Sequence, residues 1–272
     1  MLRHAIIPLA GQGTRLLPLS SISPKELLPI NGKSNLEYIL DECIEAGIKE
    51  FIFIISKKKE SIRKYFFNDQ FYKMILAKKK DKRINKIFKK MKKYQKMIKF
   101  VYQNEPKGTG DAILKCKNYI KNSHFLMLFP DDLIIKKNCT KEMILLHKKT
   151  KGSIIATKTV KKETVSRWGI LSPKDKKKNY FKIKDVVEKP SSIKAPSNYA
   201  IIGRYILPKI IMKKLKKLKP GKGGEIHITD GIKQLIKDGE NFYGNIFKGR
   251  YLDCGTLDGY ISSSAQITKE SK

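Results

Sequence analysis

Apolar and polar positions along the chain follow two different periodicities. Four short runs are almost continuously apolar, as expected for strands buried on both faces of a parallel sheet. Segments between these runs repeat apolar residues at helical spacing, and the first has Ser34 or Asn35 as its cap and Gly47 as its stop. The expected strands are Ala5–Leu9, Phe51–Ile55, Ile98–Tyr102 and Phe125–Phe129, and the expected helices run from 35 to about 46, from 60 to 67 and onward from Gly110. This alternation predicts a doubly wound α/β sheet with its ligand at the carboxyl ends of the strands.

Two further regions have patterns of their own. Ile84, Ile87, Phe88 and Met91 recur at helical spacing in the Lys-rich segment 69–99. They predict an amphipathic helix that packs on the domain or on a neighbouring subunit rather than on a membrane. A second part of the chain begins near residue 150, with a strand at Ile154–Val160, a Lys-rich hairpin near 173–184 and helices near 208–218 and 228–238.

Length and cysteine usage set the broad class of the protein. A chain of 272 residues can bury a large core, which fits one large α/β domain or two closely joined lobes. The first residues lack the pattern of a secretory leader, and no apolar run reaches membrane-spanning length. The four cysteines are scattered without a Cys-x-x-Cys pair, which favours reduced thiols over disulfides or a zinc site. We therefore expect a cytoplasmic protein.

The net charge of +34 would ordinarily indicate nucleic acid or another polyanion as a partner. Only seven of the 59 basic residues are arginine, however, and the lysines are spread over almost every segment. Sites that read bases or grip phosphates favour the planar fork of arginine. Lysine enrichment of solvated surfaces therefore explains the charge better than nucleic-acid binding does. A positive field would still attract phosphorylated substrates.

Candidate chemistry is concentrated where the first strand ends. The segment Ala10-Gly11-Gln12-Gly13-Thr14-Arg15 follows that strand directly, and Lys25 comes ten residues later between two prolines. Glycines let the backbone turn sharply and bring its amide groups close to an anion. Arg15 and Lys25 add two cations near the same point. The combination predicts a nucleoside triphosphate held by its phosphates.

Two better-known phosphate loops are excluded by single residues. Leu16 stands where the dinucleotide fingerprint G-x-G-x-x-G has its third glycine. Leu27 stands where a Walker A loop ending at Gly32-Lys33-Ser34 would have its first glycine. An ordinary glycine turn is the alternative for Gly11-x-Gly13 alone, but the adjoining cations make it the weaker interpretation.

Acidic residues at the end of a buried strand are the second chemical feature. Asp131 and Asp132 follow the run Phe125–Phe129 through Pro130, so their side chains are expected to point into the ligand crevice. Carboxylates are the usual hard ligands of Mg²⁺, which binds one or two of them together with substrate phosphates. For this acidic pair taken alone, a polar turn is the alternative interpretation.

Together these stretches resemble the bacterial UTP–glucose-1-phosphate uridylyltransferases, a branch of the sugar-1-phosphate nucleotidyltransferases. The likeness runs from residue 5 to about 262 and rests on Ala5–Pro18, Ser23–Ile30, Gln103–Ile113, Val187–Pro190 and Tyr251–Thr256. It implies a Rossmann-like, mixed and mostly parallel sheet flanked by helices, with a smaller β-rich lobe for the sugar. Residues 1–262 would form one nucleotidyltransferase domain, in which 1–150 bind the nucleotide and 151–262 the sugar. Residues 263–272 would be a polar tail.

The resemblance also implies roles for individual residues. Arg15, Lys25 and Lys189 would be catalytic, the first two on the pyrophosphate side and the third on the sugar phosphate. Asp131 and Asp253 would hold Mg²⁺. The nucleotide would be bound by Ala10, Gly11, Gly13, Thr14, Glu26, Gln103 and Gly108, and the sugar by Asp132, Gly169, Glu188 and Lys189. For Asp132, support of its neighbour Asp131 is the alternative role, and Trp168 departs from the family pattern by standing where tyrosine is usual.

The implied reaction is Mg²⁺-assisted in-line attack of glucose 1-phosphate on the α-phosphorus of UTP, which gives UDP-glucose and pyrophosphate. A sugar phosphate is already an anionic nucleophile, so the reaction needs no general base. The same chemistry with dTTP or another sugar phosphate is one alternative, and a non-catalytic regulatory or polyanion-binding relative is the other. The resemblance further implies a homo-oligomer, either a dimer or a tetramer, with no membrane partner.

Overall fold

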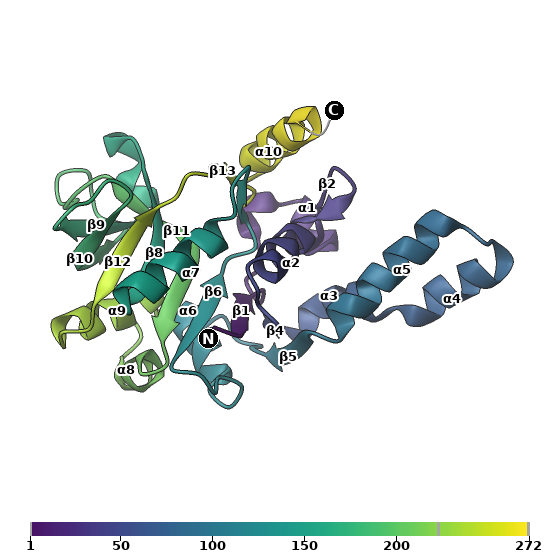
Figure 1. The fold of residues 1–272 in the computed structure, drawn as a ribbon, viewed down its shortest axis with the longest axis horizontal. Coiled ribbons are helices and arrows are strands. Elements are labelled where there is room, and N and C mark those ends of the chain that lie inside the picture. The colour runs from purple at the N-terminus through teal and green to yellow at the C-terminus, as the bar shows by residue number, and fades with distance from the viewer. Residues whose placement is uncertain (1, 222–223, 271–272) are drawn as a thin grey trace.

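The computed structural model describes residues 2–221 and 224–270, and its centre is one nine-stranded sheet (Figure 1). The strand order is β5-β4-β1-β6-β11-β8-β12-β10-β9. These strands are β1 His4–Pro8, β4 Glu50–Ile55, β5 Ile98–Tyr102, β6 His124–Leu128, β8 Ser153–Thr159, β9 Gly169–Lys174, β10 Tyr180–Glu188, β11 Tyr199–Pro208 and β12 Phe242–Ile246. Two small ribbons lie outside the sheet, one of β2 Pro29–Ile30 with β3 Lys33–Ser34 and one of β7 Asp132–Ile135 with β13 Arg250–Asp253.

The two halves of the sheet differ in strand direction. β5, β4, β1 and β6 are parallel, and Ala5 lies opposite Phe51 on one side and Leu126 on the other. β11 then pairs antiparallel with β6, β8 and β9, and β10 pairs antiparallel with β9 and β12. The parallel half confirms the predicted strand–helix alternation. The part after residue 150 extends the same sheet with mostly antiparallel pairs instead of building a sheet of its own, so only the N-terminal half is mostly parallel.

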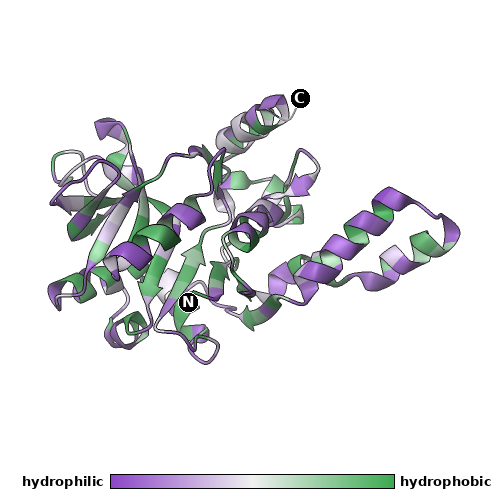
Figure 2. Ribbon diagram, viewed as in Figure 1, coloured by the Kyte–Doolittle hydropathy of each residue, from purple (hydrophilic) through white to green (hydrophobic). Residues whose placement is uncertain are grey.

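Helices cover both faces of the sheet, and each face has its own core (Figure 1). Ile7 on β1 belongs to the core under α2, α3, α5 and α7, whereas Ile6 belongs to the core under α6, α8 and α9. Because both faces are covered, the central strands are apolar at most positions, and they are drawn largely in green in Figure 2, whereas the helices have mixed colours. The helices are α1 Leu19–Ile22, α2 Asn35–Glu45, α3 Glu60–Phe67, α4 Asp69–Lys78, α5 Lys82–Gln95, α6 Gly108–Lys115, α7 Cys139–Thr150, α8 Ile211–Lys217, α9 Ile228–Lys237 and α10 Leu257–Glu270.

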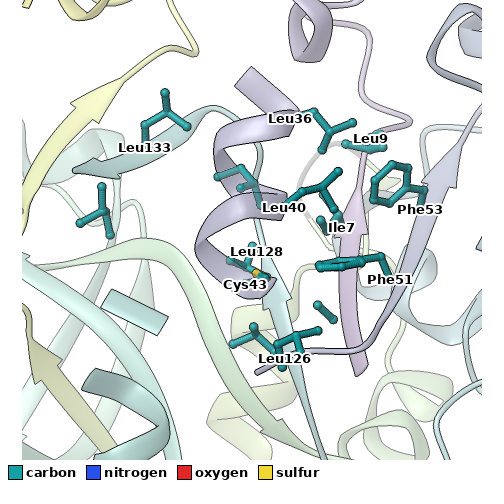
Figure 3. Packing of buried hydrophobic residues seen from close by; sticks show 14 of the residues in the cluster. Ile7, Leu9, Leu36, Leu40, Cys43, Phe51, Phe53, Leu126, Leu128 and Leu133 are labelled. Carbon is teal, nitrogen blue, oxygen red and sulfur yellow. The ribbon is translucent and has the colours of Figure 1, made fainter. Parts of the chain in front are cut away.

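Helix α2 shows how local sequence sets an element that later supports the site. Ser34 and Glu37 form a capping box, in which the Ser34 hydroxyl accepts from the Glu37 amide and the Glu37 carboxylate accepts from the Ser34 amide. Gly47 follows the helix at φ +92°, a left-handed conformation that favours glycine. The apolar face of α2 lies over β1, β4 and β6 in Figure 3, so the predicted cap, stop and buried face are confirmed.

The Lys-rich segment 69–99 contains two helices where the sequence predicts one. α4 and α5 form an antiparallel hairpin that projects from the body (Figure 1), and the rings of Tyr72 and Phe88 stack between them at 5.4 Å. Met91 and Tyr94, near the end of α5, are buried in the main core. The apolar spacing therefore serves two surfaces, first the partner helix and then the body of the protein.

The C-terminal segment differs from the expected polar tail. Residues 263–270 continue helix α10, and Ser263 and Ile267 are buried against the body. A polar composition with one apolar residue per turn or two is enough for a surface helix. Residues 271 and 272 lie outside the described residues.

Within the described residues, none of the helices has the length and apolar character needed to span a bilayer.

Candidate active site

The glycine loop connects β1 to a short 3₁₀ turn at Thr14–Leu16. Gly13 caps that turn at φ +70°, a conformation that side chains rarely adopt, and the Ser20 hydroxyl donates to its carbonyl oxygen at 2.8 Å. At Gly11, an added Cβ would have no atom within 4 Å. The loop thus has one glycine that shapes the turn and one that leaves space beside the backbone.

Lys25 and Asp131 form the central ion pair of the site. The Lys25 ammonium donates to the Asp131 carboxylate at 2.5 Å, and each side chain is 15% exposed. Burial opposes ionisation of Asp131, but Lys25 outweighs it, so the pKa of Asp131 lies below its usual range. Arg15 reaches the same carboxylate at 3.8 Å from a more exposed position. The structure therefore brings together all three residues that the sequence places near the phosphates.

Asp131 and Asp253 face a common point next to Gly255. A Cβ on Gly255 would stand 2.7 Å from an Asp131 carboxylate oxygen and 3.2 Å from an Asp253 carboxylate oxygen. The Arg15 guanidinium would stand 3.2 Å from the same Cβ, so any residue larger than glycine would crowd all three side chains. Two carboxylates beside a phosphate site fit the donor set that Mg²⁺ uses, because the substrate supplies the remaining oxygens. Among the described residues there is no cluster of three or more His, Cys, Asp or Glu side chains placed to hold a metal.

Asp132 has a different environment from its neighbour. Its two carboxylate oxygens accept from the Tyr251 hydroxyl at 2.6 Å and from the Gly203 amide at 3.0 Å. Burial and the adjacent Asp131 charge raise the pKa of Asp132 to about 6. These protein donors favour the supporting role for Asp132 over direct contact with the sugar.

Gln103 follows β5 at the predicted base-recognition segment and is only 7% exposed. Its amide nitrogen donates to the Gly108 carbonyl at 3.1 Å and to the Asp111 carboxylate at 2.7 Å. Both amide hydrogens are therefore used inside the protein, which leaves the carbonyl oxygen to accept from a ligand. Gly108 has φ +89°, and a Cβ there would stand 2.6 Å from the Ile226 carbonyl oxygen. This glycine is required by close backbone packing as well as by its conformation.

A cavity of about 270 Å³ joins these parts. It is lined by residues of the glycine loop, the Lys25 turn, the strand ends and the Gln103 segment, among them Ala10, Gly11, Lys25, Glu26, Gln103, Gly108 and Asp131. Of the predicted nucleotide residues, those lining the cavity come from three separate stretches of sequence and meet near the carboxyl ends of β1 and β5, where a parallel sheet places its ligand: Ala10, Gly11, Glu26, Gln103 and Gly108. Gly13 and Thr14 are not part of the cavity lining.

The predicted sugar residues form a second group that does not line this cavity. Glu188 lies opposite Gly169 in the β10–β9 ladder, and a Cβ on Gly169 would stand 3.2 Å from the Glu188 carboxylate. Lys189 follows at φ +43°, and its amide donates to the Trp168 carbonyl at 3.0 Å. A non-glycine residue in this region of the map stores backbone strain, which is common at functional sites. The Lys189 side chain is exposed.

Two buried ion pairs support the site, and neither was predicted from the sequence. Arg204 on β11 is fully buried, pairs with Glu42 of α2 at 2.9 Å and donates to the Phe129 carbonyl at 3.2 Å, just before the acidic loop. Lys59 binds both carboxylate oxygens of Glu26 at 2.8 Å. Pairs between residues so far apart in sequence leave no local pattern, and Lys59 is the third of three consecutive lysines.

These observations define a nucleotide-binding α/β protein whose site combines a glycine loop, buried cations and paired carboxylates. The model of the nucleotidyl transferase family matches residues 4–270, and the chain belongs to that family. Members of this family generally use a divalent metal.

Among the relatives, a UTP–glucose-1-phosphate uridylyltransferase of Mycoplasma pneumoniae is 36% identical over 266 residues, which cover 97% of this chain and 91% of that protein. The enzyme of the same name from Bacillus subtilis is 34% identical over 274 residues, covering 99% and 92%. A UDP-glucose pyrophosphorylase solved with UDP-glucose is 34% identical, with a TM-score of 0.87 over 99% of this chain and all of that one. A UTP-bound enzyme of Acinetobacter baumannii is 29% identical, with a TM-score of 0.84 over 98% and 93%. The resemblance drawn from the sequence motifs is confirmed.

Proposed function

We propose that this protein is a UTP–glucose-1-phosphate uridylyltransferase, which forms UDP-glucose and pyrophosphate from UTP and glucose 1-phosphate. The observation that carries the proposal is the cavity that joins the glycine loop, Lys25, Gln103 and Asp131. Relatives with this activity in their names match the chain almost end to end, which supports the choice of substrates.

The nucleotide would enter the cavity with its base toward Gln103 and its phosphates toward the glycine loop. The Gln103 carbonyl would accept from the base N–H, since its amide hydrogens are already used. Lys25 and Arg15 would stabilise the charge that develops on pyrophosphate as it leaves. Fixed charges in a partly dry site do this without reorganising during the reaction.

The sugar phosphate would approach from the side of β9 and β10. Glu188 would accept hydrogen bonds from sugar hydroxyls, and Lys189 would hold the phosphate so that its oxygen faces the α-phosphorus. One phosphorus–oxygen bond then forms from the sugar phosphate while the bond to pyrophosphate breaks, so positioning supplies much of the rate. Asp131 and Asp253 would hold Mg²⁺, which when bound supplies a Lewis acid for the phosphate oxygens.

The deciding experiment is pyrophosphate release by the purified protein with Mg²⁺ and glucose 1-phosphate, comparing UTP with dTTP. We expect strong preference for UTP. Equal or better use of dTTP would retain the mechanism but assign the protein to thymidylyl-transferring relatives. Absence of release with either nucleotide and with a panel of sugar phosphates would contradict the proposal and favour a non-catalytic role.

The setting that we propose is the cytoplasm, where UTP and sugar phosphates are available. All four cysteines are buried and unpaired, which fits a reducing compartment. We also propose a homo-oligomer, which size measurement in solution would test.

A further inference from the structure

A buried ion pair stands at the wall of the nucleotide cavity. Lys59 donates to both oxygens of Glu26, each at 2.8 Å, and the two residues are only 8% and 1% exposed. Glu26 lines the cavity, whereas Lys59 is absent from its lining and instead lines a second hollow, which shares Ala10 with the cavity. A pair this deeply buried is costly to form, since both charges leave water, and it is often no better for stability than an apolar pair. Stability therefore does not explain why an ion pair stands next to a ligand cavity.

The local position of Lys59 is also unfavourable. Lys59 is the N-cap residue of α3 and forms no side-chain hydrogen bond to that helix. Ser, Thr, Asp or Asn would cap the helix better, and a cation lies on the wrong side of the helix dipole. Helix α3 therefore lacks a good cap while the lysine side chain reaches across to Glu26. Such a local conflict is characteristic of a residue kept for a site.

Glu26 needs a cation if it is to remain charged. Burial raises the pKa of Glu26, and Lys59 and Lys25 oppose that effect. Lys25, however, already donates to Asp131 at 2.5 Å, so Lys59 is the cation that binds the Glu26 carboxylate directly. An ionised carboxylate is purely an acceptor, and the nucleoside part of UTP offers a base N–H and two ribose hydroxyls as donors.

We propose that Lys59 is a positioning residue for the nucleotide, holding Glu26 charged and fixed so that its carboxylate accepts hydrogen bonds from the nucleoside of UTP. The inference rests on the proposed function and adds a residue that lies outside the lining of the nucleotide cavity. It predicts that removing the Lys59 charge weakens UTP binding more than it affects glucose 1-phosphate.

The test compares Lys59→Met with Lys58→Met in the full-length protein. Lys58 is the adjacent, exposed lysine, so the control removes the same charge from the same turn. We expect the KM for UTP to rise about 10–100-fold in Lys59→Met, as expected when a hydrogen bond to a charged group is lost. The KM for glucose 1-phosphate should stay within twofold, and Lys58→Met should resemble the wild type. A folded Lys59→Met protein with the UTP KM of Lys58→Met would overturn the inference.

Two further variants separate positioning from folding. Lys59→Arg keeps the cation and should recover most of the UTP affinity. Glu26→Gln combined with Lys59→Met removes both charges of this pair and leaves neither unpaired, so it should fold even if the single variant does not, yet it should keep the raised KM. Wild-type UTP affinity in that double variant would show a purely structural pair and defeat the inference. Wild-type protein that releases no pyrophosphate would instead defeat the proposed function, so the two failures are distinguishable.

Discussion

On the nucleotide side of the candidate site three functional side chains are largely buried and already paired, although Arg15 is exposed, whereas Glu188 and Lys189 on the sugar side are half-buried and exposed. Lys25, Glu26 and Gln103 each have a protein partner before any ligand binds. Lys189 has an exposed side chain on a strained backbone, and Glu188 is half-buried beside Gly169. The difference indicates that the nucleotide meets a preorganised surface and that the sugar side depends on backbone placement. Variants on the two sides should therefore fail in different ways.

The largest effect is expected from Lys25→Ala. It removes the buried cation next to Asp131, and loss of one such electrostatic contact typically costs about 10²–10³ in kcat. Steady-state pyrophosphate release measures the change, and circular dichroism checks the fold. The exposed Lys57→Ala variant is a control from the same side of the molecule. A folded Lys25→Ala protein with near-normal kcat would contradict the role of Lys25 on the nucleotide side.

The matching change on the sugar side is Lys189→Ala, for which we expect a fall of about 10² in kcat/KM for glucose 1-phosphate. The KM for UTP should change little, because this lysine does not line the nucleotide cavity. Lys189→Gly tests the strain separately: it removes the same cation but tolerates φ +43°, so it should be more stable than Lys189→Ala by about 1 kcal/mol. If the two variants have the same melting temperature, the backbone at position 189 is not strained.

A smaller effect is expected at Gly255, which lies beside the carboxylates of Asp131 and Asp253. A methyl group there would stand 2.7 Å from the Asp131 carboxylate, so Gly255→Ala should raise the Mg²⁺ concentration needed for half-maximal rate by about tenfold, roughly 1.4 kcal/mol. Gly221→Ala is the control, since its Cβ would meet nothing nearer than 3.8 Å. Unchanged Mg²⁺ dependence would mean that Asp131 and Asp253 do not share a metal.

The last effect concerns the dependence of stability on pH and leaves catalysis aside. The pKa of Asp132 is raised to about 6, so its contribution to folding is greatest below the unfolded value of about 4 and is lost as pH rises through 6. Asp132→Asn should flatten this dependence. The fall in the free energy of unfolding between the two pH values should be smaller than in the wild type by about 1–2 kcal/mol, a figure discounted for access of water to the carboxyl group. Urea midpoints at pH 4.5 and 7.5 measure it. If the urea midpoints of the two proteins change equally with pH, the titrating group is not Asp132.

Much of the fold could be predicted because single segments carry the signal. The apolar runs of β1, β4 and β6 and the cap and stop of α2 depend on neighbours within one element. The continuation of α10 past residue 263 was missed, since its two buried residues are too sparse to stand out in a polar sequence. The first helix of the 69–99 hairpin, α4, was missed because none of its residues is fully buried.

The site divides in the same way. Its glycines, Lys25 and Asp131 stand in compact motifs, so their positions could be predicted from the order of residues alone. The partners Lys59, Tyr251 and Arg204 could not, because each acts across a long sequence separation. Arg204 and Glu42 are 162 residues apart and meet only because the fold brings a side chain of β11 to a side chain of α2.

The Glu42–Arg204 pair has a consequence for how the sequence can vary. Arg204 holds the Phe129 carbonyl two residues before Asp131, and Glu42 neutralises Arg204 from a helix that contributes no residue to the lining of the nucleotide cavity. Removing one partner of a buried pair leaves an uncompensated charge and typically costs about 3–5 kcal/mol. A survey of random inactivating mutations should therefore recover position 42 about as often as the reactive residues, although a map of ligand contacts would omit it.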